Sequence, residues 1–119
     1  MNEFIEKPHG VTDISLQYFD DNIAKIGKVR TVRGSGNKNG VVYRMELIGD
    51  DGRMELDGFA WGYHGTGPQG AVRVLTQVGV PRDLAERTIF QAHVPAQKEK
   101  DRSIVPHWEL DLDSIPRQT

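Results

Sequence analysis

The chain of 119 residues contains no cysteine, which excludes disulfides, thiolate nucleophiles and cysteine-ligated zinc or iron–sulfur centres. It has no apolar run near the roughly 18 residues that a transmembrane helix requires, so we expect no membrane partner. Fifteen lysines and arginines against seventeen aspartates and glutamates leave a net charge of −2, and no overall positive field attracts polyanions. The first residues lack the cationic and then apolar pattern of a signal peptide. These absences favour a cytoplasmic protein, and the length indicates a single domain over residues 1–119.

Signatures of catalysis and metal binding are also scarce. The four histidines do not have the short spacing of a metal-binding motif, so we expect no metal and no cofactor. None of the serines lies in a recognisable nucleophile elbow. The sequence therefore favours a binding protein over an enzyme.

Alternation of apolar and polar residues predicts the first strands. Ile14, Leu16 and Tyr18 alternate with polar residues, which predicts a strand over 14–18, followed by a turn over 20–22. A second strand is predicted over 28–33 by the same period. Residues 34–40 are rich in glycine and have no apolar side chain, so we expect an exposed and mobile loop.

A near-repeat predicts a hairpin in the middle of the chain. The sequence Arg-Met-Glu-Leu at 44–47 recurs at 53–56, on the two sides of Gly-Asp-Asp-Gly at 49–52. A two-residue turn would place Leu47 opposite Leu56, whereas a four-residue loop would place it opposite Met54. Either register keeps the same apolar side chains on one face: Tyr43, Met45, Leu47, Met54 and Leu56.

Beyond the hairpin the pattern predicts a bulge, two helices and a last strand. The parity of the apolar residues changes at Gly58, which predicts a bulge that redirects the aromatic residues after it. A helical stripe predicts a helix that starts near Pro68, with Thr66 or Gly67 as its cap, and ends at Gly79. A second helix is expected over 81–91 and a solvated loop over 96–102. The last strand is expected over 108–112, at an edge or in a sheet that is buried on one side only.

The order of these elements predicts an α+β domain. Strands come first and helices later, without regular alternation of the two, which favours an antiparallel sheet. We therefore expect an antiparallel sheet of about five strands, with two short helices on one face.

The glycine-rich turn before the first predicted helix is the best candidate for a ligand site. Gly62, Gly65, Gly67 and Gly70 lie within nine residues, and they allow close approach of the backbone to a ligand. The first N–H groups of a helix lack intrahelical partners and can hold a phosphate or carboxylate. Thr66 and Arg73 could add donors, and Trp61 and Tyr63 could offer flat faces to a base. A purely structural turn explains the same glycines, because they also let a chain reverse tightly.

The segment from Gly58 to Pro68 resembles a family of small uncharacterised bacterial and mobile-element proteins. That family carries a Gly-Phe-x-Trp-Gly-Tyr-x-Gly-Ser/Thr-Gly-Pro signature, and the looser part of the resemblance extends to Trp108-Glu109-Leu110 and Ile115. The resemblance covers about half of the chain and implies no established activity. Glycine commonly occupies the position of His64 in the family, which implies that the backbone, and not this side chain, is what the motif supplies.

A basic segment lies between Asn22 and Arg44. It holds six cations and no acidic residue: Lys25, Lys28, Arg30, Arg33, Lys38 and Arg44. Such a segment can concentrate a polyanion even on a net-acidic protein. A solvated face that balances acidic neighbours is the simpler explanation.

These features lead to three hypotheses on function. The first is a non-enzymatic protein that binds a phosphorylated small molecule, such as a nucleotide or a cyclic-nucleotide signal; the resemblance to mobile-element proteins would suit an anti-defence sponge. The predicted ligand-binding residues are Trp61, Tyr63, Gly65, Thr66, Gly67, Gly70, Arg73, Arg30, Arg33 and Arg44. The second hypothesis is a module that uses the basic hairpin to bind nucleic acid or a host protein. The third is a small hydrolase or transferase acting on a phosphorylated substrate, with His64 or Asp57 as its catalytic group. We also expect a homo-oligomer.

Overall fold

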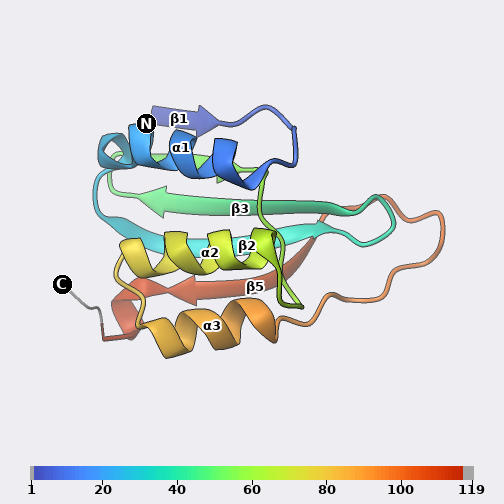
Figure 1. Cartoon of the computed structure of the whole chain (residues 1–119). Coiled ribbons are helices and arrows are strands. Elements are labelled where there is room, and N and C mark those ends of the chain that lie inside the picture. Colours follow the sequence, from blue (N-terminus) through green and yellow to red (C-terminus); the bar gives the residue numbers. More distant parts are fainter. Residues whose placement is uncertain (1, 117–119) are drawn as a thin grey trace.

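One layer of helices covers one five-stranded sheet in the computed structural model, which describes residues 2–116 (Figure 1). The elements follow in this order: β1 (Asn2–Ile5), α1 (Thr12–Asn22), β2 (Val29–Asn37), β3 (Val42–Gly49), β4 (Gly52–Leu56), α2 (Thr66–Gln77), α3 (Arg82–Phe90) and β5 (Val105–Asp111). Short 3₁₀ turns at Ile23–Ile26 and Leu112–Ser114 follow α1 and β5.

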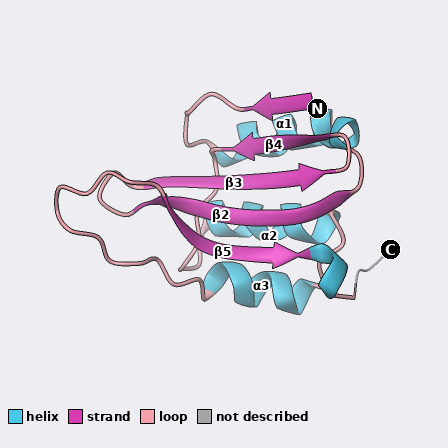
Figure 2. Cartoon of the chain, turned by 180° about the vertical axis from the view of Figure 1, so that it is seen from behind, coloured by secondary structure: helices cyan, strands magenta, loops and turns pink. Residues whose placement is uncertain are grey.

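The sheet has the strand order β1-β4-β3-β2-β5. All three helices lie on one face of it, and the view from behind shows the other face uncovered (Figure 2). The α+β class, the five strands and the placement of helices on one face are thus confirmed. The purely antiparallel sheet is wrong, because β1 runs parallel to β4 while the other neighbouring strands are antiparallel.

The hairpin of β3 and β4 is confirmed in the register of the four-residue loop. Leu47 pairs with Met54, and Met45 pairs with Leu56. All four of these side chains are buried in the core beneath the helices. Period-2 alternation identified this face correctly because one side of each strand is buried and the other is not.

The strand predicted over 14–18 is wrong, since these residues belong to α1. Burial recurs at Ser15 and Phe19, four residues apart, and this spacing marks the inner face of a helix. Ile14, which the strand pattern counted as apolar and inward, is 52% exposed. The turn predicted over 20–22 is the last turn of the same helix. The sheet's first strand is instead β1, which the sequence pattern did not indicate.

Two predictions about glycines are also corrected. Residues 34–37 continue β2, and Gly34, Gly36 and Asn37 are buried rather than exposed. Gly34 is needed there because a Cβ would collide with the Trp108 indole. No strand follows the predicted bulge at Gly58, because β4 ends at Leu56.

The helices of the second half are confirmed as α2 and α3, so that the described chain has three helices rather than two. Gly79 follows α2 with a φ of 103°, the left-handed conformation that ends many helices. Gly70 lies where α2 crosses α1, and a Cβ there would come within 2.6 Å of the Thr12 methyl group. No helix within residues 2–116 is both long enough and apolar enough to span a membrane.

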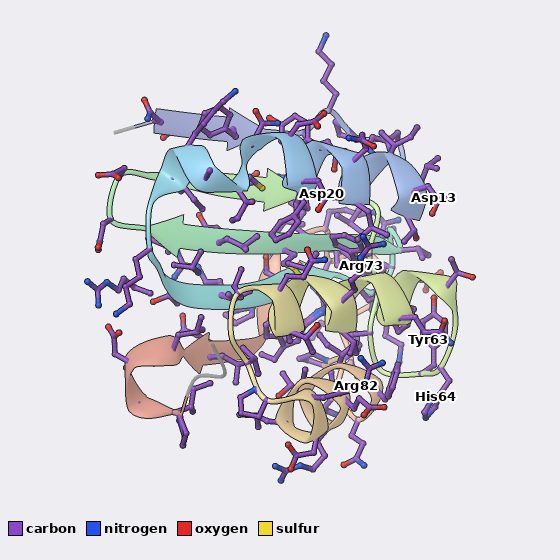
Figure 3. All side chains as sticks on the ribbon, turned by 60° about the vertical axis from the view of Figure 1, so that its left-hand side comes forward. Asp13, Asp20, Tyr63, His64, Arg73 and Arg82 are labelled. Carbon is purple, nitrogen blue, oxygen red and sulfur yellow. The ribbon has the colours of Figure 1, made fainter. Side chains whose placement is uncertain are left out.

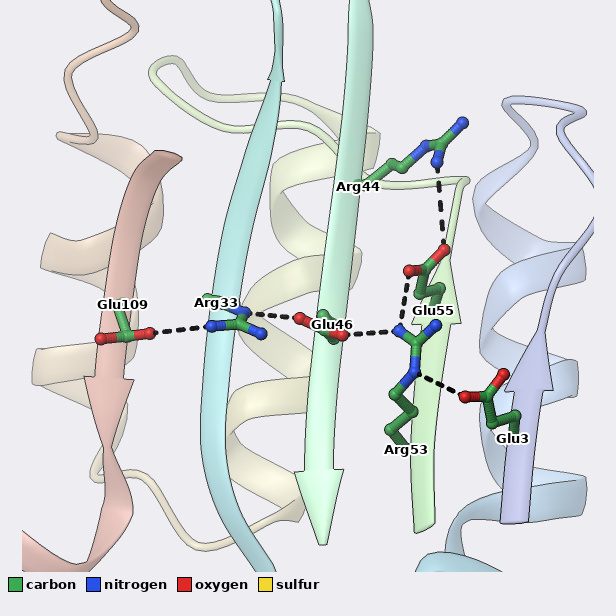
Figure 4. Close-up of polar contacts among 7 residues, drawn as sticks. All are labelled: Glu3, Arg33, Arg44, Glu46, Arg53, Glu55 and Glu109. Atoms are coloured by element: carbon green, nitrogen blue, oxygen red, sulfur yellow. Dashed lines mark hydrogen bonds and ion pairs between the residues drawn. The ribbon is translucent and has the colours of Figure 1, made fainter. Parts of the chain in front are cut away.

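The uncovered face of the sheet carries a row of alternating charges (Figure 4). From β1 to β5 the row consists of Glu3, Arg53, Glu46, Arg33 and Glu109. Arg53 contacts the carboxylates of Glu3 and Glu46 at 3.3 and 2.6 Å, and Arg33 contacts Glu46 and Glu109 at 2.5 and 3.6 Å. The two arginines are therefore neutralised by neighbours on adjacent strands.

Candidate functional site

A groove of about 610 Å³ opens where β4 leaves the sheet, and we call it the Tyr63 groove. Its volume lies within the range of small-molecule sites. It is bounded by the segment after β1, the start of β3, the segment after β4 and the start of α2. The lining residues are Pro8, His9, Gly10, Thr12, Val41, Val42, Tyr43, Arg44, Asp57, Gly58, Phe59, Ala60, Tyr63 and Gly67.

Three of the predicted ligand-binding residues meet in this groove: Tyr63, Gly67 and Arg44. Tyr63 is 51% exposed, so its ring is accessible to a ligand. Arg44 has a half-exposed side chain that pairs with the Glu55 carboxylate at 4.0 Å. Glu55 binds Arg53 more closely, at 2.9 Å, which leaves the Arg44 guanidinium available for an anion.

Tyr43 is a further groove residue, which the sequence placed only on the inner face of the hairpin. Its ring packs edge-on against Trp61, with the centroids 5.2 Å apart. Burial raises the pKa of the Tyr43 phenol, and the nearby Tyr63 raises it further. The Tyr43 phenol therefore stays protonated at neutral pH and can act as a neutral hydrogen-bond donor.

The start of α2 offers free backbone donors beside the Tyr63 groove. Gly65 precedes the helix in an extended conformation and provides no side-chain cap. Within residues 2–116, no hydrogen bond takes up the N–H of Thr66 or Gly67, whereas the N–H of Gln69 donates to Gly65 O. Thr66 is exposed, and Gly67 is partly exposed. These N–H groups carry the partial positive charge of a helix N-terminus and remain open to an anion.

One wall of the Tyr63 groove is held by a buried polar network that the sequence did not indicate. The Asp57 carboxylate accepts hydrogen bonds from the N–H groups of His9 and Gly10, both at 2.5 Å. Glu6, which is buried, accepts from the Ser15 hydroxyl and from the Asp57 N–H. These contacts fix residues 6–10, which have no regular secondary structure, against the segment after β4. No spacing rule could find the contacts of Asp57, because its partners lie about fifty residues away in the sequence.

Val41 lies on the rim of the same groove in an unusual conformation. It is 75% exposed and has a φ of 51°, a region in which a β-branched residue is strained. It therefore presents an apolar surface at the groove, at a cost to the backbone.

A second groove, the Arg73 groove, is lined by the predicted residues Thr66, Gly70 and Arg73, whereas Gly65 lines neither groove. It has a volume of about 700 Å³ and runs between the three helices. Its lining residues are Thr12, Asp13, Leu16, His64, Thr66, Gln69, Gly70, Val72, Arg73, Thr76, Arg82, Glu86 and Phe90. Figure 3 shows Tyr63 and His64 on the segment that leads into α2, and Arg73 farther along that helix.

The cations of the Arg73 groove face carboxylates. Arg73 lies 3.9 Å from Asp20, and Arg82 lies 3.8 Å from Glu86. Asp13 adds another negative charge to the lining. This balance makes the Arg73 groove less suited to a phosphate than the Tyr63 groove, although Thr12 lines both and the two grooves meet there.

Trp61 is part of the core and is not available to a ligand. Its side chain is 1% exposed. Its Nε1–H donates to His107 Nδ1 at 2.8 Å, and its ring packs edge-on against Trp108. The buried Trp61 ring thus fixes the position of the Tyr43 ring through their edge-on contact. The sequence could not separate its role from that of Tyr63, because both are aromatic residues beside the same glycines.

Arg30 and Arg33 do not reach either groove. Arg30 binds Asp50 at 2.9 Å and Asp113 at 3.1 Å, at the opposite end of the strands from Arg44. Arg33 belongs to the row of charges on the uncovered face (Figure 4). Two of the six cations of the basic segment are therefore paired with carboxylates from other parts of the sequence.

The candidate catalytic groups are not brought together. Asp57 lines the Tyr63 groove with its carboxylate bound to two backbone N–H groups. His64 lines the Arg73 groove, where its ring stacks on Phe90 with centroids 4.2 Å apart. Within residues 2–116, no group of three histidine or acidic side chains is placed to hold a metal ion. Comparisons with protein-family models, curated proteins and solved structures found no match.

Proposed function

We propose that this protein binds a phosphorylated small molecule of the nucleotide type in the Tyr63 groove. The observation that carries the proposal is the convergence of Arg44, Tyr63 and the free N–H of Gly67 on one groove. A guanidinium and a helix N-terminus both favour an anion. An accessible tyrosine ring favours a flat base or a sugar.

The anionic end of the ligand would lie at the first turn of α2. Gly67 would donate its N–H group within the groove, and the preceding Thr66, which lines the Arg73 groove, would donate from beside it. Gly65 would let the ligand approach the backbone. The flat part would extend between Tyr63 and Val41, over a floor of Phe59 and Ala60. A mostly apolar groove with a few fixed polar groups is the usual form of a small-molecule site.

A panel of linear and cyclic nucleotides in a thermal-shift assay tests this proposal. A ligand at one hundred times its Kd should stabilise the folded protein by about 2.7 kcal/mol, which corresponds to a rise in Tm of about 10 °C for a chain of this size. Arg44→Gln and Tyr63→Ala should each reduce the shift. Arg33→Gln is the matched control, because Arg33 lines neither groove. An equal shift in all four proteins, or none at any millimolar nucleotide, would contradict the proposal.

Binding without turnover is the activity that the site supports best. Asp57 and His64 line different grooves and form no acid–base pair, so a bound nucleotide should be recovered intact. Sequestration of a nucleotide signal, as an anti-defence protein would perform it, is the biological role that the sequence resemblance suggests. Homo-oligomerisation stays a prediction, to be checked by light scattering.

A further inference from the structure

The tip of the β2–β3 hairpin is fastened to the long loop before β5 by side-chain amides. Asn37 Nδ2 donates to the carbonyl oxygens of Asp101 and Ser103, at 3.1 and 2.8 Å. Asn39 Nδ2 donates to the carbonyl oxygens of Lys98 and Asp101, at 2.5 and 3.0 Å. Two neutral amide groups thus hold residues 98–103 against the hairpin.

Asn39 is followed by Gly40, and this is the only Asn–Gly pair in the sequence. Glycine has no side chain to hinder its own backbone nitrogen. That nitrogen can therefore attack the side-chain carbonyl carbon of the preceding asparagine. The attack forms a bond between Asn39 Cγ and Gly40 N, breaks the bond between Cγ and Nδ2, and releases ammonia. Water then opens the cyclic imide to aspartate or isoaspartate, without any oxidant or other reactant.

The folded structure restrains both reacting groups of this pair. The N–H of Gly40 donates to Asn37 Oδ1 at 2.9 Å. This hydrogen bond restrains the Gly40 nitrogen, which is the nucleophile, from attacking Asn39. The departing Asn39 amide is held by its two carbonyl partners. Asn37 itself is buried, so the restraint persists until the hairpin tip separates from the loop.

We propose that Asn39 is a site of spontaneous deamidation, restrained by Asn37, and that its conversion releases the loop at 98–103. The product has a carboxylate where the amide donated two hydrogen bonds. This carboxylate would face the carbonyl oxygens of Lys98 and Asp101, which are acceptors only. The carboxylate and the carbonyl oxygens repel each other, so the two hydrogen bonds between the hairpin tip and the loop cannot form again. The proposal does not depend on the ligand of the Tyr63 groove.

The first test measures deamidation of the intact protein at mildly alkaline pH by mass spectrometry with peptide mapping. The exchange of NH₂ for OH should occur at Asn39, and more slowly in the folded chain than in its tryptic peptide. Asn37→Ala should accelerate it at least about fivefold, because the Gly40 N–H loses its acceptor and the loop loses two further hydrogen bonds. Gly40→Ala is the control that should suppress it. A Cβ at Gly40 meets no atom closer than 3.4 Å, so this variant keeps the fold.

The second test uses Asn39→Asp, which reproduces the charge of the product. Trypsin should cut after the exposed Lys98, Lys100 or Arg102 about five- to thirtyfold faster than in the unmodified protein, because two hydrogen bonds are lost. Asn22→Asp, at the end of α1, is the control of equal charge and should leave these cleavages unchanged. Equal rates of cleavage in Asn39→Asp and the unmodified protein would overturn the proposal. So would deamidation at Asn39 that is as fast in the folded chain as in the peptide.

Discussion

Replacement of Trp61 by phenylalanine should lower stability strongly and leave the Tyr63 groove able to bind. Trp61 is almost fully buried, and its N–H is bonded to His107. The smaller ring leaves a cavity, which costs about 2 kcal/mol, half of the loss for a full truncation. The orphaned His107 Nδ1 adds about 1 kcal/mol. The sum of about 3 kcal/mol corresponds to a fall in Tm of about 12 °C.

Urea denaturation of Trp61→Phe and Tyr63→Ala, each followed by a nucleotide titration, is the assay. Tyr63→Ala should change stability by no more than about 0.5 kcal/mol, because the side chain is half exposed, and it should weaken binding. Trp61→Phe should lower the unfolding free energy and leave nucleotide binding unchanged. A Trp61→Phe protein of unchanged stability that no longer binds would refute the assignment of Trp61 to the core.

Three further predictions concern other parts of the fold. Burial lowers the pKa of His107, with a smaller effect from His93. The unfolded chain therefore takes up the proton at a higher pH than the folded chain, and the unfolding free energy should fall as the pH drops below about 6.5. Urea titrations should show that this pH dependence is weaker in His107→Gln and unchanged in His64→Gln. Val41→Gly should raise the unfolding free energy by about 1 kcal/mol by relieving the left-handed backbone, measured by the same method, and should reduce nucleotide affinity. Gly70→Val should lower stability by about 1–3 kcal/mol through overpacking against Thr12 and Phe59, whereas Gly40→Ala should leave Tm unchanged.

Much of the sheet could be predicted from the sequence because its strands are buried on one side only. Met45, Leu47, Met54 and Leu56 alternate with charged residues, and this alternation gave the hairpin and its buried face. The same period misled at 14–18, where a short apolar alternation also fits a helix with Ser15 and Phe19 inward. β1 has only four residues, too few to display a period.

The candidate site could be predicted only in part, since contacts distant in sequence assemble it. The free N–H groups at the start of α2 followed from the glycine-rich turn. The selection of Arg44 over Arg30 and Arg33 depends on strand register, which brings Glu46, Asp50 and Asp113 to the other two arginines. The wall built on Asp57 depends on a contact across nearly half of the chain, which no local pattern contains.

The backbone N–H signals of Thr66 and Gly67 provide the most direct test of nucleotide binding at the Tyr63 groove. In a titration followed by two-dimensional ¹H–¹⁵N NMR, the nucleotide that stabilises the protein should shift these two signals and that of Tyr63 most, while the signals of the β5 edge stay in place. Shifts confined to residues of the uncovered face or of α3, with Thr66 and Gly67 unmoved, would contradict the account.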